Sequence, residues 1–390
     1  MTVHSLRNTL GLIGLIVALP LLQLVPLPFD IWRNLPGRAI AAEILATAGV
    51  PERMRPLSLD PELTVGSALE LLPGIAGFVC ALNLGRSERR RTIAAIVAMA
   101  AASAMLGCLQ RATGPGTWLT PFGSTHDAFA PGFFVNRNHQ ATLLLIAIAL
   151  VGALVRTSPA RSSRRGPGAM WLLALVALLL GAGVVATTSR MGLALLAPAC
   201  LAALAIAGIT PRSARQWLAA SVAVAIGALG ILQTSGVALV LGRFGEEIDG
   251  RAIFATRSWV AAMDFWPVGS GLGAFPRVLP LFELRGQIGP AFVNNAHNEY
   301  LELAVETGIF GMAGLVAFGV WLTARGLRLL AARGMETAPA EVAAAVAIVI
   351  VLAHSVVDYP LRMAGLMAVF GVLCGIIAAS SAGRDAGGAR

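Results

Sequence analysis

Long blocks of apolar residues alternate with short polar stretches along the chain. The blocks cover residues 8–27, 65–84, 92–110, 139–156, 169–187, 191–209, 216–234, 299–323, 340–357 and 363–382. Each is close to the roughly 20 residues that an α-helix needs to cross a bilayer. Strands of membrane barrels are shorter and alternate in polarity, unlike these blocks. The pattern therefore predicts an all-α, polytopic membrane protein with about ten transmembrane helices.

The composition agrees with this prediction. Hydrophobic residues make up 57% of the chain and charged residues 13%, with a mean hydropathy of +0.77. A soluble domain has about 25% charged residues, so a soluble enzyme, a disordered chain and a disulfide scaffold are excluded. The first block follows Arg7 and has no small-residue cleavage site after it, which predicts a retained helix. We expect one transmembrane domain over residues 1–390.

The placement of arginine predicts the orientation. All 29 basic residues are arginine, and the net charge is +9. The main clusters occupy alternate connections, at Arg86–Arg91, Arg156–Arg165, Arg212–Arg215, Arg325–Arg333 and Arg384–Arg390. The positive-inside rule assigns that side to the cytoplasm. We therefore expect a multi-pass membrane protein, with membrane lipid and no nucleic acid as partner.

The connection over residues 235–298 then lies on the opposite, periplasmic side. Loops this long between helices are usually functional. His297 stands at its end, and Asn298 and Glu302 follow at the start of the eighth block. Ionisable groups at membrane depth are costly and usually functional, so these residues predict a site at the outer mouth of that span. On one continuous helix, His297 would share a face with Gly308. The alternative is a capping or interfacial histidine.

Arginines also lie on the outer side, where orientation does not require them, among them Arg137, Arg190, Arg251 and Arg257. Each alone could reach toward lipid headgroups. Together they predict an anionic ligand such as a pyrophosphate, because guanidinium pairs two-pronged with phosphate oxygens. The sequence around Arg251 and Arg257 is rich in aromatic and aliphatic residues, which predicts an interfacial helix.

Other motifs narrow the chemistry. The glycine-rich segment 267–276 lacks a preceding strand, so we expect a tight loop that allows close backbone approach instead of a nucleotide site. The sequence has no HExxH motif, and no histidine and carboxylate cluster at ligand spacing on the outer side. We therefore expect no metal and no cofactor.

Four segments together resemble the O-antigen ligase and polymerase superfamily. They are TTSRMG (187–192), GRFGEEIDGR (242–251), FWPVGSGLGAF (265–275) and NNAHNEYLELAVETGIFG (294–311). The last satisfies the family's motif of His, Asn, nine residues and Gly. The resemblance implies a GT-C-like membrane fold with a ligase-like core over 170–315. It also implies metal-independent transfer of a glycan from an undecaprenyl-diphosphate carrier to an acceptor hydroxyl on the periplasmic face.

By the same resemblance, His297, Arg190 and Arg251 are the expected catalytic residues, with Arg257 a near alternative to Arg251. Arg137, Asn298 and Glu302 are expected to bind substrate. The acceptor stays open between lipid A–core, as in O-antigen ligation, and a growing glycan, as in polymerisation. A lipid-linked glycan transporter is a third possibility. The charged residues of a transporter would be buried at mid-membrane, whereas those of this chain gather at the outer rim.

Overall fold

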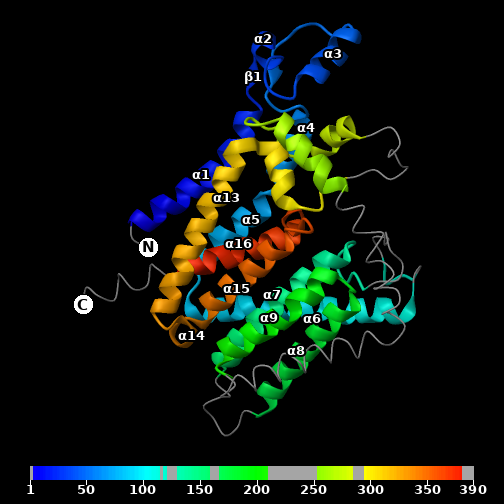
Figure 1. Ribbon diagram of the computed structural model, residues 1–390. Helices are drawn as coiled ribbons and strands as arrows, with labels where there is room; N and C mark the ends of the chain where they lie inside the picture. Colours follow the sequence, from blue (N-terminus) through cyan, green and yellow to red (C-terminus); the bar gives the residue numbers. More distant parts are fainter. Residues whose placement is uncertain are drawn as a thin grey trace.

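The structure is a computed structural model, and it describes residues 3–114, 117–120, 130–158, 167–209, 253–283 and 294–379. The described part is mostly helical, with one short ribbon (Figure 1). Its elements are α1 (Val3–Gln23), β1 (Pro26–Leu27), α2 (Phe29–Trp32), α3 (Ala39–Thr47), β2 (Arg55–Pro56), α4 (Pro61–Glu70), α5 (Leu72–Leu82), α6 (Arg86–Thr113), α7 (Arg137–Arg156), α8 (Pro167–Ala186), α9 (Arg190–Ala207), a helix over 253–264, α12 (Phe275–Val278), η2 (Leu279–Phe282), α13 (Glu299–Ala331), α14 (Gly334–Thr337), α15 (Pro339–His354), η4 (Pro360–Arg362) and α16 (Ala364–Ala379).

Every predicted apolar block that falls within the described residues coincides largely with helix. The block at 216–234 lies outside them. Five helical segments are long and apolar enough to cross a membrane: Pro61–Leu82, Arg86–Thr113, Arg137–Arg156, Arg190–Ala207 and Glu299–Ala331. Four shorter apolar helices accompany them. The helical, polytopic membrane character is confirmed, and the count of ten spans stays a prediction.

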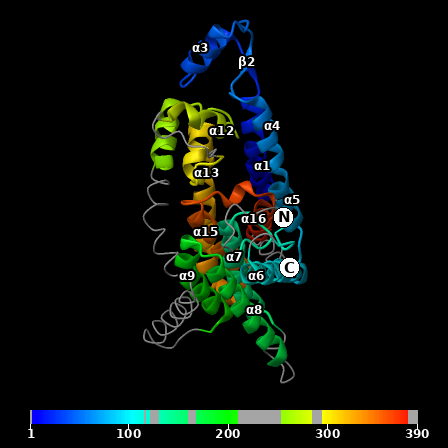
Figure 2. The same ribbon diagram turned by 90° about the vertical axis from the view of Figure 1, so that its right-hand side faces the viewer.

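Helix α7 forms the centre of the membrane region. Of its 18-residue window of highest hydropathy, 94% is buried, and α6, α8, α9 and α15 pack around it (Figure 2). This follows from its sequence, because a helix that is apolar on all sides is stable only where other apolar surface surrounds it. A rigid, buried α7 gives the residues at its beginning a fixed position.

Helices α5 and α16 approach each other closely through glycine. A Cβ atom added to Gly371 would collide with the carbonyl oxygen of Gly74. One added to Gly375 would lie 2.6 Å from the Cβ of Ala81. Small residues at such contacts are typical of membrane helices, because they let the two backbones pack together.

The two ends of the helical bundle differ in chemistry. At one end, Arg89 Nη1 of α6 donates a 2.8 Å hydrogen bond to Glu341 Oε1 at the start of α15. At the other end of α15, the Nδ1 atom of His354 lies 2.9 Å from Thr142 Oγ1 near the start of α7. The start of α6, with its predicted cytoplasmic arginine cluster, therefore lies at one end of the bundle. The start of α7 lies at the other end.

The predicted eighth span is not one continuous helix. Gly308 has φ 55° and ψ −139°, so the chain turns sharply between a first segment, 299–307, and a second, 309–331. Figure 1 shows the yellow first segment and the yellow-to-orange remainder running in different directions. The prediction that His297 and Gly308 share one helical face is therefore wrong. A Cβ at position 308 would collide with the carbonyl oxygen of Pro267, so the break requires glycine.

The glycine-rich loop after Pro267 causes this break. Ser270 N–H donates to the Val305 carbonyl and Gly271 N–H to the Glu306 carbonyl, both at 2.9 Å. Ile309 N–H in turn donates to the Pro267 carbonyl at 2.9 Å. The loop thus replaces the helical hydrogen bonds that α13 loses at the break. The predicted close backbone approach of this loop is confirmed, and its partner is a helix.

The connection between α1 and α4 contacts the glycine-rich loop after Pro267. This connection contains the β1–β2 ribbon, α2 and α3. Arg38 within it is fully buried, and its Nη2 atom donates to the carbonyls of Leu57 at 2.6 Å and Gly269 at 3.0 Å. Burial lowers the pKa of Arg38 to about 10.

The helix over 253–264 was expected around Arg257, and its position at the membrane interface stays a prediction.

Candidate functional site

His297 lies in the short segment that leads into α13. Its φ is 50°, a conformation that only a few per cent of residues other than glycine adopt. The next residue, Asn298, is the N-cap of α13, so the histidine precedes the helix and does not cap it. Its side chain is 34% exposed, which leaves part of the imidazole open to a reactant.

Three of the five histidines surround Asp358, which lies in the turn between α15 and α16. Oδ1 of Asp358 lies 3.6 Å from Nδ1 of His297, and Oδ2 lies 3.8 Å from Nε2 of His139. Tyr359 packs edge-on against both imidazoles, with ring centroids at 5.2 Å and 5.0 Å. The carboxylate is 1% exposed, so these contacts replace its water.

The histidines keep Asp358 ionised. Burial by itself would raise the pKa of this carboxyl, but the nearby imidazoles of His297, His139 and His354 hold it below its usual value. An ionised partner at Nδ1 favours the His297 tautomer with its proton on that nitrogen. Nε2 of His297 is then available to accept a proton.

Three helices begin around this cluster, each with a capped N-terminus. Asn136 Oδ1 accepts from Asn138 N–H at 2.8 Å to cap α7, and Ser189 Oγ accepts from Gly192 N–H at 3.2 Å to cap α9. Asn298 Oδ1 accepts from two backbone N–H groups, both at 3.1 Å, to cap α13. Helix N-termini carry partial positive charge, so their convergence favours an anionic ligand.

Two of the predicted arginines lie at these N-termini. Arg137 is the first residue of α7, and its Nη1 donates to Thr188 Oγ1 at 3.1 Å. Thr188 has φ 52° and stands two residues before Arg190, which begins α9. Asn136 Nδ2, beside Arg137, lies 3.5 Å from Asp358 Oδ2. The start of α7 therefore links the Arg190 segment to Asp358 and so to His297.

The other predicted arginines are placed differently. Arg251 lies outside the described residues. Arg257 lies in the helix over 253–264, is 8% exposed, and its Nη1 is 3.5 Å from Glu283 Oε1. A carboxylate thus already contacts the Arg257 guanidinium, and its role as an alternative to Arg251 stays a prediction.

The structure gives Asn298 and Glu302 contacts within the protein. The Asn298 oxygen caps α13 as described above. Glu302 is 1% exposed; its Oε2 accepts from Ala296 N–H at 2.8 Å, and its Oε1 lies 3.2 Å from Arg362 Nε. Glu302 therefore lies buried beneath the His297 segment, and its expected contact with substrate stays a prediction.

Sequence reasoning missed Asp358, His139 and His354. His139 and His354 lie within predicted apolar spans, and Asp358 lies in a short turn far along the chain. The usable signal was the rarity of such residues within or beside apolar spans, because buried titratable groups there need partners. In the described residues, no group of three or more His, Cys, Asp or Glu side chains is arranged to hold a metal ion.

Comparison with known proteins shows a similarity to one family. Residues 173–316 match the family model described as O-antigen ligase. This part of the chain is therefore similar to the O-antigen ligase family. The match contains α9 and the His297 segment, and the resemblance inferred from the sequence is confirmed. No curated protein sequence matches the chain.

Among solved structures, one that is similar along most of the chain can be named. It is described as "Structural coordination of polymerization and crosslinking by a peptidoglycan synthase complex". The similarity covers 96% of this chain and 97% of that chain, with 17% identity and a TM-score of 0.45. A likeness at this level carries no conclusion about fold or function.

Proposed function

We propose that this O-antigen ligase-like protein moves a glycan from an undecaprenyl-diphosphate carrier to a hydroxyl of lipid A–core, at the periplasmic face of a bacterial inner membrane. One observation carries the proposal: His297 pairs with the buried Asp358 carboxylate where α7, α9 and α13 begin. The cluster lies at the opposite end of the bundle from the Arg89 cluster, which supports a periplasmic site.

The arginines and helix N-termini hold the leaving group in this proposal. As the glycosidic C–O bond breaks, its electron pair passes to the diphosphate oxygen. Positive groups fixed beforehand stabilise that developing charge most effectively. Arg190 and Arg137 supply them from the described residues, and Arg251 completes the clamp as the family resemblance implies.

His297 activates the acceptor. Its Nε2 takes the proton of the incoming hydroxyl while that oxygen bonds to the anomeric carbon. The Asp358 carboxylate stabilises the resulting imidazolium, because an opposite charge at 3.6 Å favours the protonated ring. Charge balances, since the diphosphate leaves as an anion and the proton stays on His297. Metal independence is part of this proposal, with His297 as base and arginine as the electrophilic group.

The choice of lipid A–core over a growing glycan rests on the description of the matching family model. Deletion of the gene from its native strain separates the alternatives. Loss of ligation leaves carrier-linked polymer and lipid A–core without glycan. Loss of polymerisation leaves only single repeat units, on the carrier or on lipid A–core. Loss of transport traps carrier-linked glycan on the cytoplasmic side. The proposal predicts the first result, and either of the others contradicts it.

A further inference from the structure

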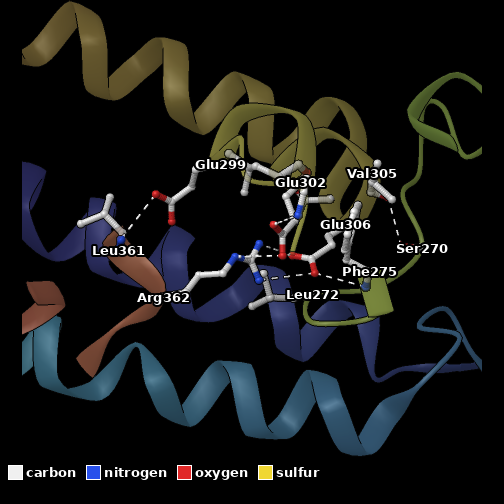
Figure 3. A network of polar contacts seen from close by, with 12 residues as sticks. Ser270, Leu272, Phe275, Glu299, Glu302, Val305, Glu306, Leu361 and Arg362 are labelled. Carbon is white, nitrogen blue, oxygen red and sulfur yellow. Dashed lines mark hydrogen bonds and ion pairs between the residues drawn. The ribbon is translucent and has the colours of Figure 1, made fainter. Parts of the chain in front are cut away.

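A buried ion-pair network lies directly beside the His297 and Asp358 pair. Arg362 donates from Nη2 to Glu306 Oε2 at 2.8 Å and from Nη1 to Glu306 Oε1 at 3.4 Å. Its Nε lies 3.2 Å from Glu302 Oε1. Figure 3 shows the guanidinium of Arg362 between these two glutamates, both on the first segment of α13. The two glutamate side chains are 1% and 0% exposed and that of Arg362 is 21% exposed, so the two carboxylates are desolvated.

Each end of this network is tied to one member of the pair. Glu302 Oε2 accepts a 2.8 Å hydrogen bond from Ala296 N–H, immediately before His297. Arg362 follows Asp358 by four residues in the same short turn. The Glu302–Arg362 ion pair therefore joins the backbone that carries the imidazole to the backbone that carries the carboxylate.

The histidine needs such support. Its φ of 50° is unfavourable for a residue with a Cβ atom and persists only where the surroundings fix it. Glu299 gives a second connection, because its Oε2 accepts from Ser355 Oγ at 2.9 Å. That contact joins α13 to the beginning of the turn, whereas Arg362 joins it to the end. Asp358 lies between the two attachments.

We propose that Arg362, acting through Glu302, is a positioning residue that sets the geometry between His297 and Asp358. The expected change in transfer rate rests on the proposed function. The expected change in the geometry of His297 and Asp358 rests on the contacts alone. A guanidinium can serve Glu302 and Glu306 together because its donors are spread over a planar fork. A lysine ammonium keeps the charge and loses that geometry.

The test compares Arg362→Lys and Glu302→Gln with wild type. Glu302→Gln retains an oxygen for Ala296 N–H but removes the charge that attracts Arg362. The control is Arg277→Lys, because Arg277 also pairs with a carboxylate, Asp60, at 3.1 Å, but its side chain is 68% exposed. All four proteins are purified in detergent, and every rate is normalised to monodisperse, folded protein.

The kinetic readout is glycan transfer at varied donor concentration. We expect kcat to fall by about 10–10² in Arg362→Lys, since a displacement of about 1 Å at a catalytic group has an effect of this size. The donor KM should stay within about twofold, because the arginines that hold the diphosphate are unchanged. Glu302→Gln should show the same pattern, and Arg277→Lys should match wild type.

A second readout does not depend on the reaction. Diethyl pyrocarbonate acylates accessible imidazoles, and peptide mass spectrometry reports the rate at His297 separately from the buried His139 and His354. Release of His297 from Asp358 should raise its acylation rate in both network variants and not in Arg277→Lys. If the wild-type protein shows no transfer but His297 is acylated faster in both network variants than in wild type, the proposed function is refuted and the positioning role is supported.

Unchanged acylation and unchanged kcat per folded molecule, in both Arg362→Lys and Glu302→Gln, would overturn the proposal. A lower yield of folded protein with normal kcat in what remains would also overturn it, because that pattern describes a purely structural ion pair. If Arg362→Lys yields no folded protein, Glu302→Gln alone decides by the same two readouts.

Discussion

The Nδ1 atom of His297 lies 3.6 Å from Oδ1 of Asp358, although 61 positions separate them in the sequence. The turn after α15 supplies the carboxylate, and the segment before α13 supplies the imidazole. Glu299 N–H donates to the Ser355 carbonyl at 3.0 Å and holds these two segments together. The site is therefore assembled by tertiary packing between distant parts of the chain.

Replacement of Asp358 by asparagine tests this relationship. An amide has nearly the same shape but no charge, so it cannot stabilise the imidazolium and no longer favours a proton on Nδ1 of His297. Transfer should fall by about 10²–10⁴ while carrier-linked donor still binds. Steady-state transfer and donor binding, measured on the same folded preparation, check this. Equal loss of binding and transfer would place Asp358 in donor binding instead.

Replacement of Arg190 by lysine tests the diphosphate clamp. The charge is preserved and the two-pronged geometry is lost, so both donor affinity and transfer should decrease. The matched control is Arg277→Lys, because Arg277 is exposed at the same end of the molecule and pairs only with Asp60 among the described contacts. Isothermal titration with the carrier-linked donor reports affinity. Wild-type affinity and rate in Arg190→Lys would remove this residue from the clamp.

Replacement of Gly308 by alanine tests the helix break. The φ of 55° and ψ of −139° are strained for alanine, and its Cβ would collide with the Pro267 carbonyl. We expect destabilisation by more than about 1 kcal/mol and a lower thermal midpoint in detergent. Gly314→Ala is the control, because a Cβ there meets nothing within 4 Å on the same helix. Equal midpoints for the two variants would contradict the account of the break.

The orientation of the chain is tested by reporter fusions. A phosphatase that is active only in the periplasm is fused after Glu283, in the long outer connection, and after Arg333, beyond α13. The arginine clusters predict activity for the first fusion and none for the second. The reverse result would place the His297 site at the cytoplasmic face and contradict the proposed donor geometry.

The helices could be predicted because each apolar block has the length that a membrane imposes, and that signal is local. The importance of His297 could also be inferred, since polar residues at membrane depth are rare. The break at Gly308 could not, because its cause is the loop after Pro267, 41 positions earlier. Asp358 and His139 were missed for the same reason: their significance arises only when α7 and the α15–α16 turn pack together. The pairing of Glu302 with Arg362 could not be predicted either, because the two residues lie on different elements far apart in the sequence.

The most direct test of the central claim is transfer by His297→Ala, normalised to folded, membrane-inserted protein and measured beside donor binding. A base contributes roughly 10²–10⁴ in rate, so transfer should fall by that factor while the donor binds normally. His297→Gln should be nearly as slow, because an amide can accept a hydrogen bond but cannot take the proton. Wild-type transfer per folded molecule in His297→Ala would contradict the account and leave the arginines as the site without a histidine base.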